Sequence, residues 1–143
     1  MKTLKSLFLA LALLVVTGAV KANNMPDNEK YTKTHAINVY LDAMTRGKVQ
    51  GLNDVLDQTV KFSMLRGKKI LSFSKKEMTD FLNSEKNVEQ ACTTSTEVIE
   101  SNNDMAVIKV DMKFDGFVRS NYVTVTNTGK GGWKITNVYS VFK

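Results

Sequence analysis

The last forty residues constrain the fold more than any other stretch, because they hold three strand-like runs separated by turn signals. In the first run, 105–114, every even position is apolar and three of the five odd positions are charged. This period of two predicts a strand with one buried face. Asp115-Gly116 then predicts a tight hairpin turn, because the favoured two-residue turns need positive φ at both positions. Two further runs, 117–126 and 133–142, complete a three-stranded meander.

The strand register follows from the lengths of the two turns. The first turn would place Phe114 opposite Phe117 and Met112 opposite Arg119. For the second we expect a five-residue loop, 127–131, because a four-residue loop would turn Lys134 toward the core. The pairs implied across the last two strands are Val125 with Trp133, Val123 with Ile135, Asn121 with Asn137, and Arg119 with Tyr139.

Helical patterns dominate the chain before the meander. A helix is expected from about 25–28 to Arg46, with an apolar stripe at 37, 40, 41 and 44 and with Gly47 as its end. A short helix near 52–56 should follow. Ser74 and Glu77 have the spacing of a capping box, which predicts the start of a third helix.

The remaining strands complete an α+β pattern. Residues 59–65 alternate, 66–68 form a turn signal, and 69–73 are expected to return as a second strand. A polar, threonine-rich strand over 88–100 leads into the meander. The predicted fold class is therefore α+β, with a curved, mostly antiparallel sheet wrapped around three helices from the N-terminal half.

The first 22 residues have the pattern of a secretory signal peptide. Lys2 and Lys5 precede an apolar run over 7–16, and Val20-Lys21-Ala22 carries small residues at cleavage positions. The run is far shorter than the ~20 residues needed to span a bilayer. We expect cleavage after Ala22, with Ala19 as the alternative, and a secreted or periplasmic domain over 23–143.

Charge and ligand-type residues exclude several classes of partner and cofactor. Without the three signal lysines, 17 basic and 14 acidic residues leave a net charge of +3, spread along the chain. We therefore expect no nucleic-acid partner, and no membrane association once the signal is removed. Cys92 and His35 are the only residues of their types. An internal disulfide is excluded, zinc ligation has no support, and we expect no metal and no cofactor.

Several segments resemble one known family. The stretch 117–125 with Gly132-Trp-Lys-Ile-Thr-Asn137 is similar to the closing hairpin of lumazine-binding-like proteins. Ile37 to Gly47, and Phe73 to Glu77, also resemble that family. It belongs to the nuclear-transport-factor-2-like (cystatin-like cone) superfamily, with polyketide-cyclase-like and ketosteroid-isomerase-like members. The resemblance implies a cone-shaped fold with a pocket at its open end and, in many members, dimers formed through the convex face of the sheet.

The expected register gathers polar side chains at one end of an apolar face. These residues are Arg119, Asn121, Asn137 and Tyr139, and they are either bonded to one another or available to a ligand. Trp133 at the other end and Tyr40 on the first helix are further candidate ligand-binding residues, with plain core packing as the alternative for Tyr40.

The leading hypothesis is an exported, non-catalytic domain that binds a small, partly apolar molecule. No catalytic residue is assigned, because Asn137 does not titrate and Tyr139 would need a large pKa shift. One alternative is a cyclase- or isomerase-type enzyme that uses Tyr139 with Arg119. The other is a homodimeric interaction module, for which Tyr122, Val138 and Phe142 are expected on the convex face.

Overall fold

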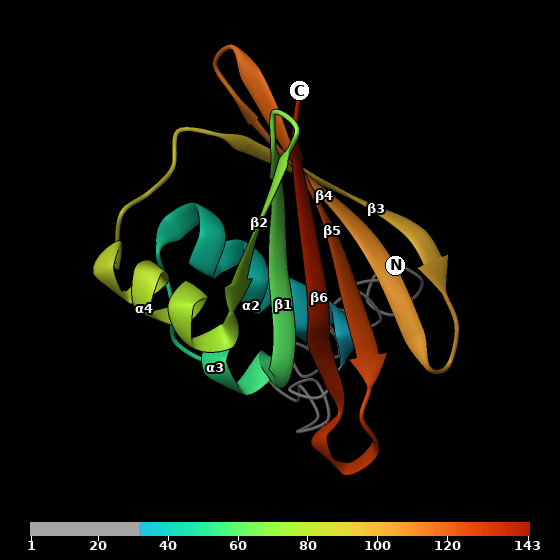
Figure 1. Cartoon of the computed structure of the whole chain (residues 1–143). Helices are drawn as coiled ribbons and strands as arrows, with labels where there is room; N and C mark the ends of the chain where they lie inside the picture. The colour runs from blue at the N-terminus through green and yellow to red at the C-terminus, as the bar shows by residue number, and fades with distance from the viewer. Residues whose placement is uncertain (1–31) are drawn as a thin grey trace, which may run out of the picture.

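A single six-stranded sheet, covered on one face by helices, organises the computed structural model, which describes residues 32–143 (Figure 1). The elements in chain order are α2 (Lys33–Arg46), α3 (Leu52–Val55), β1 (Leu56–Arg66), β2 (Lys69–Ser74), α4 (Lys75–Ser84), β3 (Thr93–Ser101), β4 (Met105–Phe114), β5 (Phe117–Asn127), the 3-10 turn η2 (Gly129–Gly131) and β6 (Trp133–Phe142). The predicted α+β class is confirmed. The predicted signal peptide and helix start near 25–28 lie outside the described residues.

The sheet order is β2-β1-β6-β5-β4-β3, and only β1 and β6 pair in parallel. The chain therefore makes its one long crossing after α4. That connection, residues 85–92, passes over the C-terminal end of α2 to reach β3 (Figure 1). Backbone bonds hold it there, from the Asn87 amide to the Gly47 carbonyl at 3.0 Å and from the Gln90 amide to the Thr45 carbonyl at 2.7 Å.

The helix ends follow their sequence signals. Gly47 ends α2 with φ of 64°, and a Cβ there would lie 2.6 Å from the Asn87 nitrogen, so only glycine fits. Ser74 and Glu77 form the predicted capping box at α4, with the Glu77 carboxylate accepting from the Ser74 amide at 2.7 Å.

The two hairpins of the meander differ in how well the sequence predicts them. The β4–β5 register is as expected, with Phe114 opposite Phe117 and Met112 opposite Arg119. The expected β5–β6 register is wrong. Asn127, not Val125, pairs with Trp133, because the loop closes from Thr128 to Gly132, where both the amide and the hydroxyl of Thr128 donate to the Gly132 carbonyl.

A β-bulge in β6 causes the larger error in the expected β5–β6 register, because it changes which face the later side chains lie on. Val125 pairs with Ile135 but Thr124 pairs with Asn137, so one residue of β6 is extra at this point. An extra residue reverses the side-chain alternation beyond it. The bulge lets Ile135 and Val138, three residues apart, both be buried.

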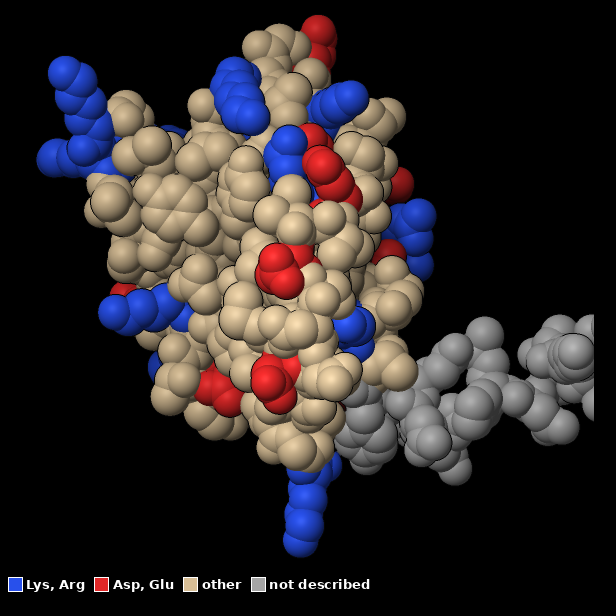
Figure 2. Space-filling view, turned by 90° about the vertical axis from the view of Figure 1, so that its right-hand side faces the viewer, with Lys and Arg blue, Asp and Glu red and all other residues tan. Residues whose placement is uncertain are grey.

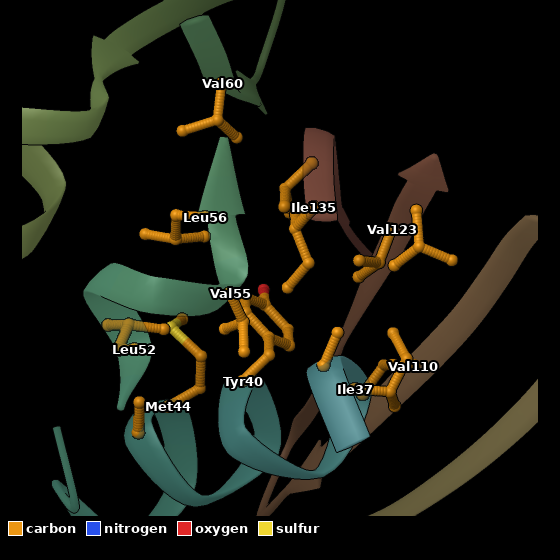
Figure 3. Packing of buried hydrophobic residues seen from close by; sticks show 14 of the residues in the cluster. Ile37, Tyr40, Met44, Leu52, Val55, Leu56, Val60, Val110, Val123 and Ile135 are labelled. Atoms are coloured by element: carbon orange, nitrogen blue, oxygen red, sulfur yellow. The ribbon is translucent and has the colours of Figure 1, made fainter. Parts of the chain in front are cut away.

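The core lies between the concave face of the sheet and α2 (Figure 3). Val123, Val125 and Ile135 have no exposed side-chain surface, and Tyr40 is 1% exposed. In Figure 3 the Tyr40 ring rises from α2 into this cluster, with its oxygen at the end nearest the sheet. Each such aliphatic side chain contributes about 1.5–3 kcal/mol to folding. This apolar end of the cone we call the closed end.

Candidate ligand-binding site

A bonded polar cluster occupies the other end of the concave face. Asn121 on β5 accepts hydrogen bonds from Arg119 Nε at 3.0 Å and from the Ser140 hydroxyl on β6 at 2.6 Å. Arg119 Nη2 also donates to Ser140 Oγ at 3.4 Å, and Asn121 Nδ2 donates to the Val110 carbonyl at 3.3 Å. Asn121 and Ser140 are buried, whereas Arg119 is half-buried. The cluster therefore fixes a guanidinium at the open end of the cone, which we call the mouth.

Arg119 and Asn121 are the two predicted polar site residues that the structure brings together. Asn137 pairs with Thr124 and Tyr139 with Tyr122, and Thr124 and Tyr122 alternate with the buried Val123 and Asn121. Asn137 and Tyr139 thus lie on the convex face, contrary to the expected register, because the bulge precedes them.

The same bulge moves three other residues to the concave face. Val138 and Phe142, expected on the convex side, pair with Val123 and Arg119 on the concave side, and Ser140 takes the position expected for Asn137. The spacing of Ile135 and Val138 was the signal for this change. Two apolar residues three apart in one strand can both face the core only across a bulge.

Within residues 32–143, neither Trp133 nor Tyr40 hydrogen-bonds to the mouth cluster. Trp133 is half-buried beside the core, and the Lys33 ammonium lies over its ring, 4.8 Å from the ring centroid. Tyr40 packs inside the core, and its hydroxyl has no hydrogen-bond partner among the described residues. Burial raises the pKa of Tyr40 to about 12, although the positive charge of Arg119 acts in the opposite direction.

A cavity of about 170 Å³ opens beside Arg119. Its apolar wall comes from α2, α4, the 85–92 connection and β4, and includes Met44, Leu82, Val88, Met112 and Phe114. The polar and charged residues in its lining are Glu85, Gln90 and Arg119. An apolar cavity with few polar groups is the usual form of a small-molecule site. We call it the mouth cavity.

Phe81 separates the mouth cavity from a larger hollow. The hollow, about 510 Å³, lies between α4 and strands β1 and β2, against Met64, Phe73 and Met78. Phe81 lines both spaces and is 58% exposed. Because the ring is largely exposed and lines both spaces, we expect a rotation of the Phe81 side chain to connect the two volumes. Spacing along α4 groups Phe81 with the buried Met78 and Leu82, so sequence periodicity gives no sign of its exposed position at the site.

Aromatic rings and a second arginine form the rim. Phe114 stacks on Phe117 with centroids 4.7 Å apart, and Phe117 lies 6.3 Å from Phe142. The guanidinium carbons of Arg66 and Arg119 lie 5.6 Å and 5.8 Å from the centroid of the Phe142 ring. Two cations therefore flank one exposed aromatic ring.

Among the described residues, neither rim arginine forms an ion pair with an acidic side chain. The ion pairs found within residues 32–143 are Arg46 with Asp42, Lys76 with Asp80, and Lys109 with Asp111. Elsewhere both signs of charge are interspersed, as on the face shown in Figure 2, where neither forms a continuous patch. The positive charge at the mouth thus has no ion-pair partner in the part of the chain that the structure describes, although the exposed Glu85 lines the same cavity.

Titratable groups suited to proton transfer are missing from the concave face in the described strands. Its residues on β4, β5 and β6 are apolar apart from Arg119, Asn121, Ser140 and the exposed Asn127 at the end of β5. No cluster of metal-ligating side chains occurs over 32–143. Cys92 is half-buried beside the core, and burial raises the pKa of its thiol. Within the same residues, every helix is too short or too polar to cross a bilayer.

Solved structures share this architecture at low sequence identity. A nuclear-transport-factor-2-like protein of unknown function from Silicibacter pomeroyi is 20% identical over 77% of this chain and 90% of its own, with a TM-score of 0.61. A cystatin-like fold protein from Burkholderia xenovorans is 14% identical over 76% and 87%, with a TM-score of 0.60. These similarities establish the cone fold.

A ketosteroid isomerase-like protein from Erwinia carotovora is also similar, at 12% identity over 82% of this chain and 98% of its own, with a TM-score of 0.56. No curated protein matches the sequence. The family described as "Putative lumazine-binding" matches residues 28–140, nearly the whole described domain and a short stretch before it. Its description suggests small-molecule binding. The chain belongs to this lumazine-binding-like family of the nuclear-transport-factor-2-like superfamily.

Proposed function

We propose that the protein binds a small, partly apolar molecule in the mouth cavity without transforming it. The observation that carries this proposal is the half-buried Arg119, which Asn121 and Ser140 hold at the edge of an apolar cavity. Buried polar groups destabilise the fold unless they are hydrogen-bonded. Here Asn121 and Ser140 bond to each other and to Arg119, so these buried groups have partners. Arg119 keeps donors for a ligand, because its Nη1 makes no bond within residues 32–143.

The catalytic alternative lacks a suitable acid or base at this place. Tyr139, which this alternative would use with Arg119, lies on the convex face, and Tyr40 keeps its proton well beyond neutral pH. Glu85 on the cavity wall is exposed to solvent, as glutamates on protein surfaces usually are. These placements favour binding over proton transfer.

Native mass spectrometry of protein purified gently from its source tests the binding proposal. We expect a fraction of the protein to carry a small-molecule adduct that is lost on denaturation. If native spectra show only apoprotein, and no apolar fragment raises the melting temperature, the proposal is wrong.

We also propose a homodimer formed through the convex face. Tyr122 and Tyr139 lie side by side there, with Val141 beyond them, all three half-buried in the monomer. A partly apolar sheet face suits contact with a second copy. Sedimentation velocity at tens of micromolar should show a dimer, and Tyr139→Glu should convert it to a monomer. A wild-type monomer at this concentration would contradict the proposal.

Export is the remaining part of the proposal, and it rests on the sequence pattern of residues 1–22. The mature protein should begin near Asn23 and be found outside the cytoplasm. Intact-mass measurement of exported protein checks this, and retention of Met1 would refute cleavage.

A further inference from the structure

We infer that the ligand carries a carboxylate, that Arg119 binds it, and that the apolar part of the ligand lies in the mouth cavity. This inference rests on the proposed binding function and adds the chemical class of the ligand. It comes from four features of the described residues: the unused donors of Arg119, the bonds that fix it, the lack of an acidic partner, and the shape of the cavity.

The guanidinium of Arg119 has donors to spare. Arginine carries five N–H donors in a planar fork. Nε bonds to Asn121 and Nη2 bonds to Ser140, and within residues 32–143 no bond from Nη1 occurs. A planar fork with free N–H groups matches the two oxygens of a carboxylate.

Asn121 and Ser140 act as positioning residues for that fork. Both are buried, at 0% and 2% exposure, and they bond to each other as well as to Arg119. The Val110 carbonyl holds Asn121 in turn. Because each acceptor is fixed by a second bond, Arg119 has little freedom to turn away from the cavity. Such preorganisation lowers the entropic cost of binding an anion.

The electrostatic surroundings favour an anion. Arg119 is half-buried, and a partly desolvated charge without a counter-ion is unfavourable. Arg66 adds a second cation beside the same Phe142 ring. Glu85 is the opposing group, since it lines the same cavity, but it is exposed and forms no ion pair with Arg119. An incoming carboxylate would supply the missing counter-charge.

The cavity limits the rest of the molecule. Met44, Leu82, Met112 and Phe114 present hydrocarbon, sulfur and an aromatic ring beside Arg119. A volume of about 170 Å³ holds a small ring or short chain, and rotation of Phe81 would admit a longer one. The ligand class is thus a small carboxylic acid with an apolar body.

Matched probes separate charge recognition from general apolar binding. Titration calorimetry of the full mature protein would compare 3-phenylpropanoate with its neutral counterpart, 3-phenylpropanol. A charge-assisted hydrogen bond should favour the carboxylate by about tenfold or more. Inorganic phosphate serves as a competitor that has charge but no apolar body, and it should not displace 3-phenylpropanoate at equal concentration.

Four variants locate the interaction. Arg119→Gln should abolish the preference for the acid over the alcohol, and Arg119→Lys should retain part of it because the charge remains without the fork. Glu85→Gln should tighten acid binding by a few-fold, since a repelling charge is removed. Lys113→Gln removes one positive charge from the exposed, opposite face of β4 and should change nothing. Glu85→Gln keeps the test decisive if changes at Arg119 impair folding.

Different outcomes would refute the carboxylate assignment and the proposed small-molecule binding. Equal affinity for the acid and the alcohol, both above background, would refute the carboxylate assignment and leave small-molecule binding intact. Displacement by phosphate, or an acid preference that survives Arg119→Gln, would also refute it. Binding of neither probe would contradict the proposed function itself. A preference for the acid that disappears in Arg119→Gln and grows in Glu85→Gln supports the inference.

Discussion

Strand β5 passes through two regions of the cone that are built differently, although both belong to one concave face. At the closed end, Val123 and Val125 are fully buried among aliphatic side chains and make no polar contact. At the mouth, two and four residues earlier in the strand, Asn121 and Arg119 make a bonded network beside a cavity. The strand alternation is the same in both regions, and only the side chains and their covering differ.

The difference separates stability from recognition. The closed end is covered by α2 and filled, so each side chain there contributes to folding through burial. The mouth is covered only in part by α4 and the 85–92 connection, so Arg119 remains accessible. Changes at the closed end should therefore lower stability, and changes at the mouth should mainly alter binding.

The largest effect should come from Ile135→Ala at the closed end. Ile135 has no exposed surface, and its truncation leaves a cavity beside Val125 and Tyr40. We expect a loss of about 2–5 kcal/mol in the free energy of unfolding. Urea denaturation measures this loss, and the affinity of the folded fraction for 3-phenylpropanoate should stay within about twofold of wild type. A loss below the expected range would show that this end is not tightly packed.

Tyr40→Phe tests the same region through pH. Folding raises the pKa of Tyr40 from 10.0 to about 12, because the buried site disfavours the charged phenolate. The folded state therefore loses stability only at pH values where the unfolded chain can lose this proton. This stability is complete below pH 10 and is lost as pH rises toward 12, by roughly 3 kcal/mol in total. The phenylalanine variant lacks this loss.

Urea midpoints at about pH 9 and pH 11.5 would show the difference as a steeper decline in the wild type. At neutral pH the variant should be at least as stable, because the hydroxyl that it removes has no partner within residues 32–143. Parallel alkaline declines in both proteins would contradict the buried position of the hydroxyl.

Asn121→Leu tests the network at the mouth. The change removes the acceptor of Arg119 Nε and of the Ser140 hydroxyl, and the Val110 carbonyl loses the bond from Asn121 Nδ2. We expect a loss of about 1–3 kcal/mol in stability, together with weaker acid binding. Asn137→Leu is the matched control on the convex face and should change stability by no more than about 0.5 kcal/mol. Equal effects of the two substitutions would refute the corrected register.

Phe81→Ala should change stability least. The ring is 58% exposed, so we expect a loss below about 1 kcal/mol. Its removal joins the mouth cavity to the hollow against Met64 and Phe73. The variant should gain affinity for acids with longer apolar chains relative to 3-phenylpropanoate, measured by competition. An unchanged order of chain lengths would show that Phe81 does not limit the site.

The sequence predicts the closed end better than the mouth, for a physical reason. Residues 105–114 are apolar at every even position and are followed by a two-residue turn, so the register of β4 with β5 is determined locally. Arg119 and Asn121 follow from this register, and both lie on the concave face as expected. The position of Tyr40 in the core follows from helical periodicity.

The β6 side of the mouth was predicted wrongly, because a bulge depends on packing across the whole sheet. Burial of both Ile135 and Val138 against α2 and β1 requires the extra residue, and this transfers Asn137 and Tyr139 to the convex face. Ser140 and Phe142 enter the mouth in their place. The 85–92 connection forms part of the wall of the mouth cavity because backbone bonds hold it against the end of α2. No local sequence pattern indicates these bonds.

Mapping amide chemical-shift changes on the mature protein, during titration with 3-phenylpropanoate, tests the central claim most directly. The separation of the two regions predicts the largest changes around the mouth cavity, at 81–90, 112–114 and 119–121, and small changes at Ala106, Val125 and Ile135. The same pattern should vanish in Arg119→Gln. Largest changes at the closed end, or at Tyr122 and Tyr139 on the convex face, would show that the ligand does not bind at the mouth.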